Sequence, residues 1–417
     1  MKYPARLVTS VLLVNQYFWP DVAATAQLLA ELAEDLWAGG ATVTALAGRG
    51  SYVPGMIEKL PRREEWRGVE IRRVRCTSFG RASTLGRVTD YLTFLAGAKL
   101  AVLFGRRRDV VICLSTPPLV GVLGLLARLR GARFVYKVED LYPDVAMMLG
   151  TLHPGSLVAR ASAKLSRLLL RRADAVVALD GAMADALSRR GASKVDVIPN
   201  WADGRAIRPD AEAGSTFRRE HDLEGRFVVL YSGNLGLAHD FTAVTEAART
   251  LAEVEPRLLF LFVGGGPRLA EVRAATEGLA SVRFVPYQPR EVLRGLFNAA
   301  DVHLVTLRDE VSGMVVPSKY AAALAAGKPV LLVGGRGTEM HEEIERENLG
   351  WCCTHESGAV RAALLHACRH TEALDGMGAR ARKLLERKYE RRLCTRRWAE
   401  LLSRVLESEK GPEAAHA

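Results

Sequence analysis

A lysine stands at the start of an alanine-rich segment in the last third of the chain, in the stretch VPSKYAAALAAGKPV at residues 316–330. Pro317 and Ser318 are typical of a helix start, so Lys319 falls on the first turn of the predicted helix. The positive end of a helix disfavours a lysine unless an anion lies there. The segment therefore favours an anion site. The alternative is a plain helix start with Lys319 in solvent.

Two glycine-rich loops could bring backbone N–H groups close to such an anion. They are SGNLG at 232–236 and GGGP at 264–267, and each follows an apolar run. Glycine permits this close approach, although many glycine-rich turns only reverse the chain. The GxGxxG and GxxxxGK[ST] fingerprints are missing, and no Asp-x-Asp follows a predicted strand. We therefore predict that lysine, backbone amides and a helix N-terminus neutralise a diphosphate without a metal.

The elements that must position these loops form two similar series of apolar runs that alternate with helical patterns, which is typical of parallel sheets covered by crossover helices. The runs lie at 7–14, 42–47, 69–74, 110–114, 133–138, 175–179 and 195–198, and then at 227–232, 258–263, 282–285, 302–306 and 329–333. We predict an α/β fold with two Rossmann-like, doubly wound domains, at 1–200 and 201–390, that face a central cleft. The tail at 391–417 reads as a helix that crosses back to the first domain.

The excess positive charge lies in the first half of the chain. Residues 1–200 hold 28 Lys and Arg against 17 Asp and Glu, whereas residues 201–417 hold 30 of each. A protein region with this excess is attracted to an anionic bilayer, a diphosphate-bearing lipid or nucleic acid. The alternative is that its basic residues only form solvent-exposed faces of helices. The apolar segment 88–104, flanked by Arg81, Arg87 and Arg106–Arg108, suits a helix on a membrane surface or a core-facing crossover helix.

The cysteines and the hydropathy indicate a reduced compartment without a spanning helix. Six cysteines show no CxxC spacing, and the His and Cys residues near 352–370 lack finger-like spacing, so we expect free thiols and no structural zinc. The longest apolar stretches are too short or are interrupted. We expect a cytoplasmic protein that lies peripherally on the inner face of the cell membrane.

The order of five motifs resembles the retaining GT-B glycosyltransferases of family four, especially the bacterial branch that builds colanic-acid-type and O-antigen surface polysaccharides. The motifs are VVALDGAMADALSRRGASKVDVIPNWAD, VVLYSGNLG, LFLFVGGGP, VRFVPYQPREVLRGLFNAADVHLV and VPSKYAAALAAGKPVLL. Two segments of the first half resemble the same family: QYFWPDVAATAQLLAELAEDLWAGGATVTALAG and FVYKVEDLYPDVAMMLG. The resemblance spans nearly the whole chain. It implies two GT-B domains and a nucleotide-sugar donor, with no cofactor.

The donor-binding residues that the resemblance implies lie in the second half: Gly233, Asn234, Gly264, Gly265, Tyr287, Glu310, Pro317, Ser318 and Lys319. Tyr287 would stack on the base, unless it is a packing tyrosine. The family's usual Arg and Lys clamp falls on Asn234 and about His239, and its usual glutamate pair falls on Met314 and Ala322. With these groups absent, Lys319 becomes the expected counter-charge for the diphosphate, and the Ser318 hydroxyl would cap the helix or reach a phosphate oxygen.

In the first half, Glu139 and Asp140 take the place where the family usually shows a His-Asp pair. We interpret them as catalytic carboxylates that bond the transferred sugar or handle the acceptor proton; helix capping is the alternative for Asp140. Tyr17, Phe18 and Trp19, beside the first predicted strand, are expected on the acceptor side.

By resemblance, we expect a metal-independent, retaining transferase that moves an N-acetylated hexosamine or deoxyhexosamine from a nucleotide diphosphate, such as UDP, to a polyprenyl-diphosphate-linked saccharide. The alternatives are a GT-B transferase that uses GDP-mannose or another donor, and a GT-B-fold binding protein without catalysis. The expected partners are the nucleotide sugar, the lipid-linked acceptor and an anionic membrane surface, with no nucleic acid.

Overall fold

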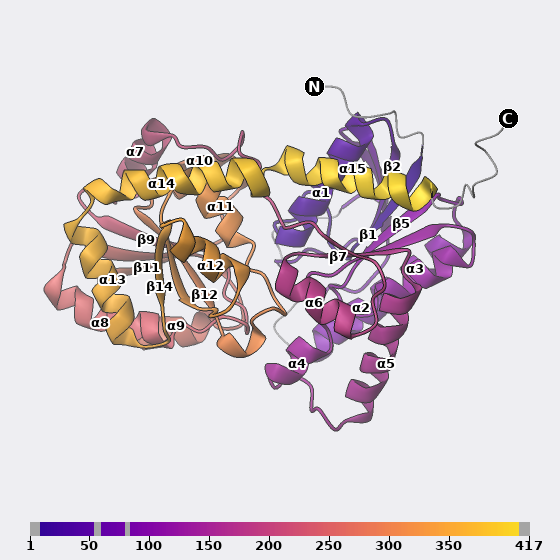
Figure 1. Cartoon of the computed structure of the whole chain (residues 1–417), viewed down its shortest axis with the longest axis horizontal. Helices are drawn as coiled ribbons and strands as arrows, with labels where there is room; N and C mark the ends of the chain where they lie inside the picture. Colours follow the sequence, from indigo (N-terminus) through magenta and orange to yellow (C-terminus); the bar gives the residue numbers. More distant parts are fainter. Residues whose placement is uncertain (1–8, 54–59, 80–83, 408–417) are drawn as a thin grey trace. The chain divides into compact units, whose positions relative to one another are not determined.

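The computed structural model describes residues 9–53, 60–79 and 84–407. The chain divides into two compact units, one of residues 1–199 with 392–417 and one of residues 200–391. Each unit contains one sheet with helices on both faces (Figure 1). Within the described residues, no helix is both long enough and apolar enough to cross a membrane.

The sheet of the first unit has eight strands in the order β3-β4-β2-β1-β5-β6-β7-β8, and only the β3–β4 pair is antiparallel. Its strands are β1 (Ser10–Val14), β2 (Thr42–Gly48), β3 (Arg63–Trp66), β4 (Val69–Val74), β5 (Val110–Leu114), β6 (Arg133–Lys137), β7 (Ala175–Ala178) and β8 (Val195–Val197). Its helices are α1 (Ala24–Ala38), α2 (Thr84–Phe104), α3 (Gly121–Arg128), α4 (Asp144–Met148), α5 (Leu157–Arg172), α6 (Gly181–Arg189) and α15 (Arg391–Glu407). The strand order reverses between β1 and β5, where such sheets bind ligands.

The sheet of the second unit has six parallel strands in the order β11-β10-β9-β12-β13-β14. Its strands are β9 (Phe227–Asn234), β10 (Leu258–Gly265), β11 (Val282–Val285), β12 (Val302–Leu307), β13 (Val330–Gly334) and β14 (Gly350–Cys353). Its helices are α7 (Ala211–Glu220), α8 (Thr242–Val254), α9 (Leu269–Ala275), α10 (Leu293–Ala299), α11 (Lys319–Ala326), α12 (Glu339–Arg346), α13 (Ser357–Arg369) and α14 (Glu372–Leu384). A π-helical turn, Leu385–Tyr389, precedes α15. Here the order reverses between β9 and β12.

Alternate residues of β9 face two different cores. Val229 and Tyr231 pack with α8 and α13, while Val228 and Leu230 pack with α7 and α10. In Figure 1, α8, α9 and α13 accordingly lie on one side of this sheet, and α10, α11 and α14 lie on the other. Burial on both faces explains why these strands read as continuous apolar runs rather than as alternating ones.

The two doubly wound units and the parallel sheets agree with the α/β GT-B fold expected from the sequence. Two edge strands, β3 and β14, escape the sequence-based prediction because REEW is mostly charged and GWCC contains no β-branched residue. The structure also extends β9 and β10 into the predicted glycine loops, since pairing continues through Gly233–Gly264 and Asn234–Gly265.

Small residues let α11 lie close to its neighbours. Most of its alanines are buried, and it ends at Gly327, which has the left-handed φ of 63° that favours glycine. A Cβ added to Gly378 of α14 would lie 2.0 Å from the Gly327 carbonyl oxygen. The close contact between α14 and the end of α11 therefore requires glycine at position 378.

We predict that Gly378→Ala destabilises the chain by about 1–3 kcal/mol, because the new methyl group meets backbone that must shift. Gly376→Ala is a matched control on α14, where the added Cβ meets only the far end of Arg380 at 3.5 Å. The control is expected to stabilise the helix by about 0.5–1 kcal/mol. Urea denaturation measures both; equal midpoints for the two variants would contradict the proposed contact.

Candidate donor site in the second unit

The carboxyl ends of β9 and β10 form a glycine-lined edge beside the point where the strand order reverses. Gly233, Gly264 and Gly266 have φ values of 127°, 131° and 140°. A Cβ at Gly264 would lie 2.2 Å from the Gly233 carbonyl oxygen, and one at Gly266 would lie 2.5 Å from the Leu235 carbonyl oxygen. Glycine is therefore required at 264 and 266 for two reasons: the φ values disfavour other residues, and a side chain would collide with a neighbouring carbonyl oxygen.

The loop after β9 is tied to the ends of two neighbouring strands. Leu235 N–H donates to the Gly265 carbonyl at 2.7 Å, and Arg308 N–H, just after β12, donates to the Ala238 carbonyl at 2.9 Å. The Arg268 guanidinium donates to the His239 carbonyl at 2.6 Å. These bonds fix the position of His239.

Lys319 reaches this loop from the first turn of α11. Its Nζ lies 3.2 Å from His239 Nε2 and 4.8 Å from the centre of the Tyr231 ring. The other ring nitrogen of His239, Nδ1, lies 2.5 Å from the Thr306 carbonyl oxygen. Nδ1 therefore carries the proton that is donated to Thr306, and Nε2 accepts from the lysine. We call Lys319, His239, Tyr231 and Thr306 the Lys319 group.

The Lys319 group has a positive charge without a carboxylate to balance it. In the part of the chain that the structure describes, Lys319 forms no ion pair. Burial lowers the pKa of the Lys319 ammonium to about 7. Burial, and then the charges of Lys319 and Arg268, hold the pKa of His239 well below its usual range, so the ring is neutral. An anion beside Nζ would restore the charged lysine.

The group sits beside the glycine-lined edge and on a supported helix. A Cβ added to Gly233, near the end of β9, would lie 3.9 Å from Lys319 Cε. The residue after the lysine, Tyr320, donates its hydroxyl to the buried carboxylate of Glu343 at 3.1 Å, and Tyr389 donates to the same oxygen at 2.9 Å. Lys388 pairs with the other oxygen of Glu343 at 2.6 Å. These bonds hold the first turn of α11 in place.

The remaining predicted donor residues of the second unit occupy the same edge or its surroundings. The Tyr287 ring lies against Gly265, where an added Cβ would be 3.3 Å from its Cε2. Asn234 lies between the two glycine loops, with its Oδ1 2.6 Å from the position of a Cβ added to Gly266. Pro317 is buried, and Ser318 precedes α11 without a side-chain cap bond, so the capping alternative for its hydroxyl is wrong. Glu310 is exposed and pairs with Arg308 at 3.5 Å.

Glu139 and Asp140 follow β6 in the first unit and share one hydroxyl. Ser115 Oγ accepts the amides of Glu139 at 2.9 Å and Asp140 at 3.2 Å. The buried Glu139 carboxylate pairs with the buried Lys137 ammonium, whereas the Asp140 carboxylate is half-buried and accepts from Thr116 at 3.3 Å. The N-cap of the next helix, α4, is Pro143, so the capping alternative for Asp140 is wrong.

The aromatic residues predicted on the acceptor side pack against other parts of the first unit. Phe18 is buried. Trp19 stacks on Trp66 with 4.7 Å between ring centres, and Tyr17 meets Tyr52 edge-on at 5.5 Å. Tyr17 and Trp19 remain half-buried, so part of each ring is accessible. Their role towards an acceptor stays a prediction.

His239 is a site residue that sequence reasoning does not identify. From the sequence it is only a substitute for a charged residue, yet its neutral ring supports the lysine that replaces the clamp. The two residues are 80 positions apart, and no local pattern links a histidine to a lysine at that separation.

The glycine-lined edge, Lys319 and the start of α11 lie together at the carboxyl ends of a parallel sheet, where doubly wound folds bind their ligands. Two family models match the chain: "Glycosyl transferase 4-like domain" at residues 24–201 and "Glycosyl transferases group 1" at residues 215–384. The chain belongs to the glycosyltransferase family that these two domains define.

Named relatives and a solved structure agree with this assignment. The chain is 26% identical over 331 residues to the probable glycosyltransferase WbjE of Pseudomonas aeruginosa, covering 78% of this chain and 82% of that one. It is 31% identical over 263 residues to the putative colanic acid biosynthesis glycosyl transferase WcaI of Escherichia coli, covering 60% and 64%. The Anabaena protein HepE in complex with UDP-glucose matches with a TM-score of 0.70 at 17% identity, over 95% of this chain and all of that one. At that identity, the match shows the shared fold.

We predict that the affinity for UDP falls as the pH rises above about 7. The pKa of Lys319 is about 7 in the free protein, so each further pH unit removes up to about tenfold of the ammonium form that an anion binds. In Lys319→Arg the charge persists at all these pH values. Calorimetric titration from about pH 6 to pH 9 measures both proteins. The same decline in the arginine variant would show that Lys319 is not the titrating group.

Proposed function

We propose that the chain transfers an N-acetylated hexosamine or deoxyhexosamine from a UDP donor to a polyprenyl-diphosphate-linked saccharide during bacterial surface-polysaccharide synthesis. The observation that carries the proposal is the Lys319 ammonium, which has no carboxylate partner among the described residues and lies beside the glycine-lined ends of β9 and β10. The likeness to WcaI, a putative colanic acid biosynthesis glycosyl transferase, supports a role in polysaccharide synthesis, and the UDP-glucose bound by HepE supports the donor nucleotide.

In this proposal, the donor diphosphate lies against the backbone of Gly233, Gly264 and Gly265. Lys319 Nζ and the amides at the start of α11 take up the charge that grows on the leaving diphosphate. The neutral His239 ring holds Nζ in place without adding a charge, and Tyr287, which borders Gly265, contacts the base. This route requires no divalent ion, because the lysine and the helix end supply the counter-charge.

The first unit would supply the groups that act on the transferred sugar and the acceptor. Asp140 is the carboxylate assigned to the reaction, because it is half-buried, whereas Glu139 is buried in an ion pair with Lys137. Asp140 would bond the sugar or accept the acceptor proton, and the fixed ion pair of Glu139 would hold the loop after β6. The transfer is proposed to retain the anomeric configuration, as in the family that the motifs resemble.

The donor assignment predicts that UDP and UDP-sugars raise the melting temperature of the purified chain, because a ligand of the native state stabilises it. Lys319→Ala should lose this shift and should lower kcat/KM for donor hydrolysis about 100-fold, the usual effect of removing one group that stabilises developing charge. Lys383→Ala, at an exposed lysine of α14, is the matched control and should keep both properties.

Three results would change the proposal. Shifts with GDP-sugars alone would replace UDP by GDP as the donor nucleotide. Ligand shifts without any hydrolysis or transfer would favour a GT-B-fold binding protein. A Lys319→Ala variant that behaves like Lys383→Ala would remove the lysine from the diphosphate site.

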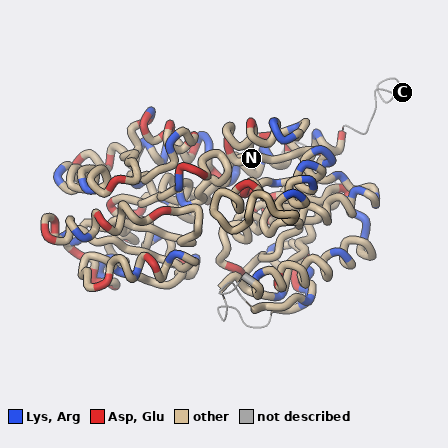
Figure 2. Tube along the Cα trace, turned by 90° about the horizontal axis from the view of Figure 1, so that it is seen from below, with Lys and Arg blue, Asp and Glu red and all other residues tan. Residues whose placement is uncertain are grey.

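The proposed membrane contact rests on the outer face of α2. One face of the helix is buried through Phe94, Ala98 and Val102, as the crossover alternative expects. The opposite face exposes a stripe of apolar side chains: Leu85, Val88, Leu92, Leu100 and Phe104, with Phe104 82% exposed. Arg106 and Arg107 follow directly; Arg81 lies outside the described residues. Figure 2 shows Lys and Arg outnumbering Asp and Glu on this unit.

We predict that the chain binds vesicles that contain anionic lipid and that Leu100→Glu with Phe104→Glu reduces binding at least tenfold. The pair removes exposed apolar surface and adds negative charge next to an anionic surface. Both side chains are exposed, so folding should be unaffected. Flotation with anionic and with neutral vesicles measures the effect, and an unchanged floated fraction would exclude this face.

A further inference from the structure

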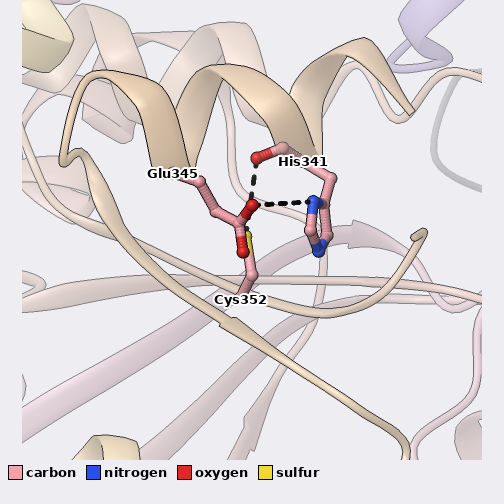
Figure 3. A group of neighbouring side chains, drawn as sticks. All are labelled: His341, Glu345 and Cys352. Atoms are coloured by element: carbon pink, nitrogen blue, oxygen red, sulfur yellow. Dashed lines mark hydrogen bonds and ion pairs between the residues drawn. The ribbon is translucent and has the colours of Figure 1, made fainter. Parts of the chain in front are cut away.

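Three side chains of zinc-binding type meet in the second unit, between α12 and the edge strand β14. His341 and Glu345 are one turn apart on α12, and Cys352 lies on the edge strand β14 (Figure 3). One ligand atom from each residue lies within 4.8 Å of the other two. His341 Nδ1 and Glu345 Oε2 are 3.7 Å apart. No CxxC or finger-like spacing in the sequence predicts that these three residues meet.

The fold holds the three residues in this arrangement. Thr338 caps α12 by accepting the His341 amide at 3.3 Å, and Met340 and Ile344 anchor the helix in the core. Residues four apart share a helix face, which brings His341 and Glu345 together. Cys352 pairs with Leu332 of β13, and its Sγ lies 3.7 Å from the His341 carbonyl oxygen.

The separations suit a small tetrahedral ion. Zinc bonds of about 2.0–2.3 Å at tetrahedral angles place ligand atoms about 3.3–3.8 Å apart. The distance between His341 Nδ1 and Glu345 Oε2 is already in that range, and it is too long for a hydrogen bond. Small side-chain rotations would bring the sulfur to the same spacing. The Glu345 side chain is 63% exposed, so water can reach the fourth position.

We propose that His341, Glu345 and Cys352 bind a Zn²⁺ ion that joins α12 to the edge strand β14. An imidazole nitrogen, a carboxylate oxygen and a thiolate sulfur are all zinc ligands, and the softness of the thiolate disfavours Mg²⁺ and Ca²⁺. The ion would replace the weak contact between Cys352 and His341 with coordination bonds. Cys352 would release its proton when the metal binds.

Cobalt provides a direct test, because Co²⁺ takes zinc sites and a thiolate ligand gives a ligand-to-metal absorption band. The purified chain should bind about one equivalent of Co²⁺ with this band, and Zn²⁺ should abolish it. Cys352→Ser should show no band. Cys353→Ser is the matched control: Cys353 points to the other face of β14, where its Sγ lies 3.6 Å from the Ala359 carbonyl oxygen. The control should keep the band.

Thermal stability gives a second readout. Zn²⁺ should raise the melting temperature of the chain and of Cys353→Ser, and a chelator should reverse the rise. Glu345→Gln, at an exposed position, should fold normally and bind at least tenfold more weakly. The proposal is wrong if wild-type protein gives no cobalt–thiolate band, or if Cys352→Ser keeps the band or the zinc-dependent shift.

Discussion

The candidate donor site depends on a lysine that the fold keeps half-buried and that has no negative partner within residues 9–53, 60–79 and 84–407. Withdrawing an ammonium from water disfavours its charged form, and the low pKa of Lys319 expresses this. The protein compensates with a neutral imidazole acceptor and the face of the Tyr231 ring. Neither contact neutralises the charge. The site is therefore electrostatically incomplete until an anion arrives.

Several distant features hold that lysine in place. The alanines of α11 and Gly378 of α14 allow close packing behind the helix, so that its first turn lies next to the end of β9. The buried carboxylate of Glu343 ties Tyr320 to Tyr389 and to Lys388. A buried carboxylate with two hydroxyl donors and an ammonium is well satisfied, so this cluster adds rigidity without an unpaired charge. The neighbouring residues Lys319 and Tyr320 thus belong to different environments. Tyr320 joins a cluster whose charges are paired, whereas Lys319 lacks a counter-charge in the part of the chain that the structure describes.

The central strands and the two doubly wound sheets could be predicted from the sequence because strands buried on both faces leave long apolar runs. The strands β3 and β14 could not, because REEW is mostly charged and GWCC contains no β-branched residue. The glycine loops and Lys319 follow from local chemistry. The contact of Lys319 with His239, and the meeting of His341 and Glu345 with Cys352, depend on how separate elements pack. Residue spacing alone carries no information about such packing.

The unusual protonation of Lys319 has a consequence beyond recognition of phosphate. An amine with a pKa of about 7 is largely unprotonated at slightly alkaline pH, and its free electron pair can then attack an electrophile. Ordinary surface lysines, with pKa values near 10.4, remain almost wholly protonated under the same conditions. Mild acylating reagents should therefore distinguish this side chain from lysines that are exposed at the surface, so that covalent ligands of the proposed donor site could be attached to it.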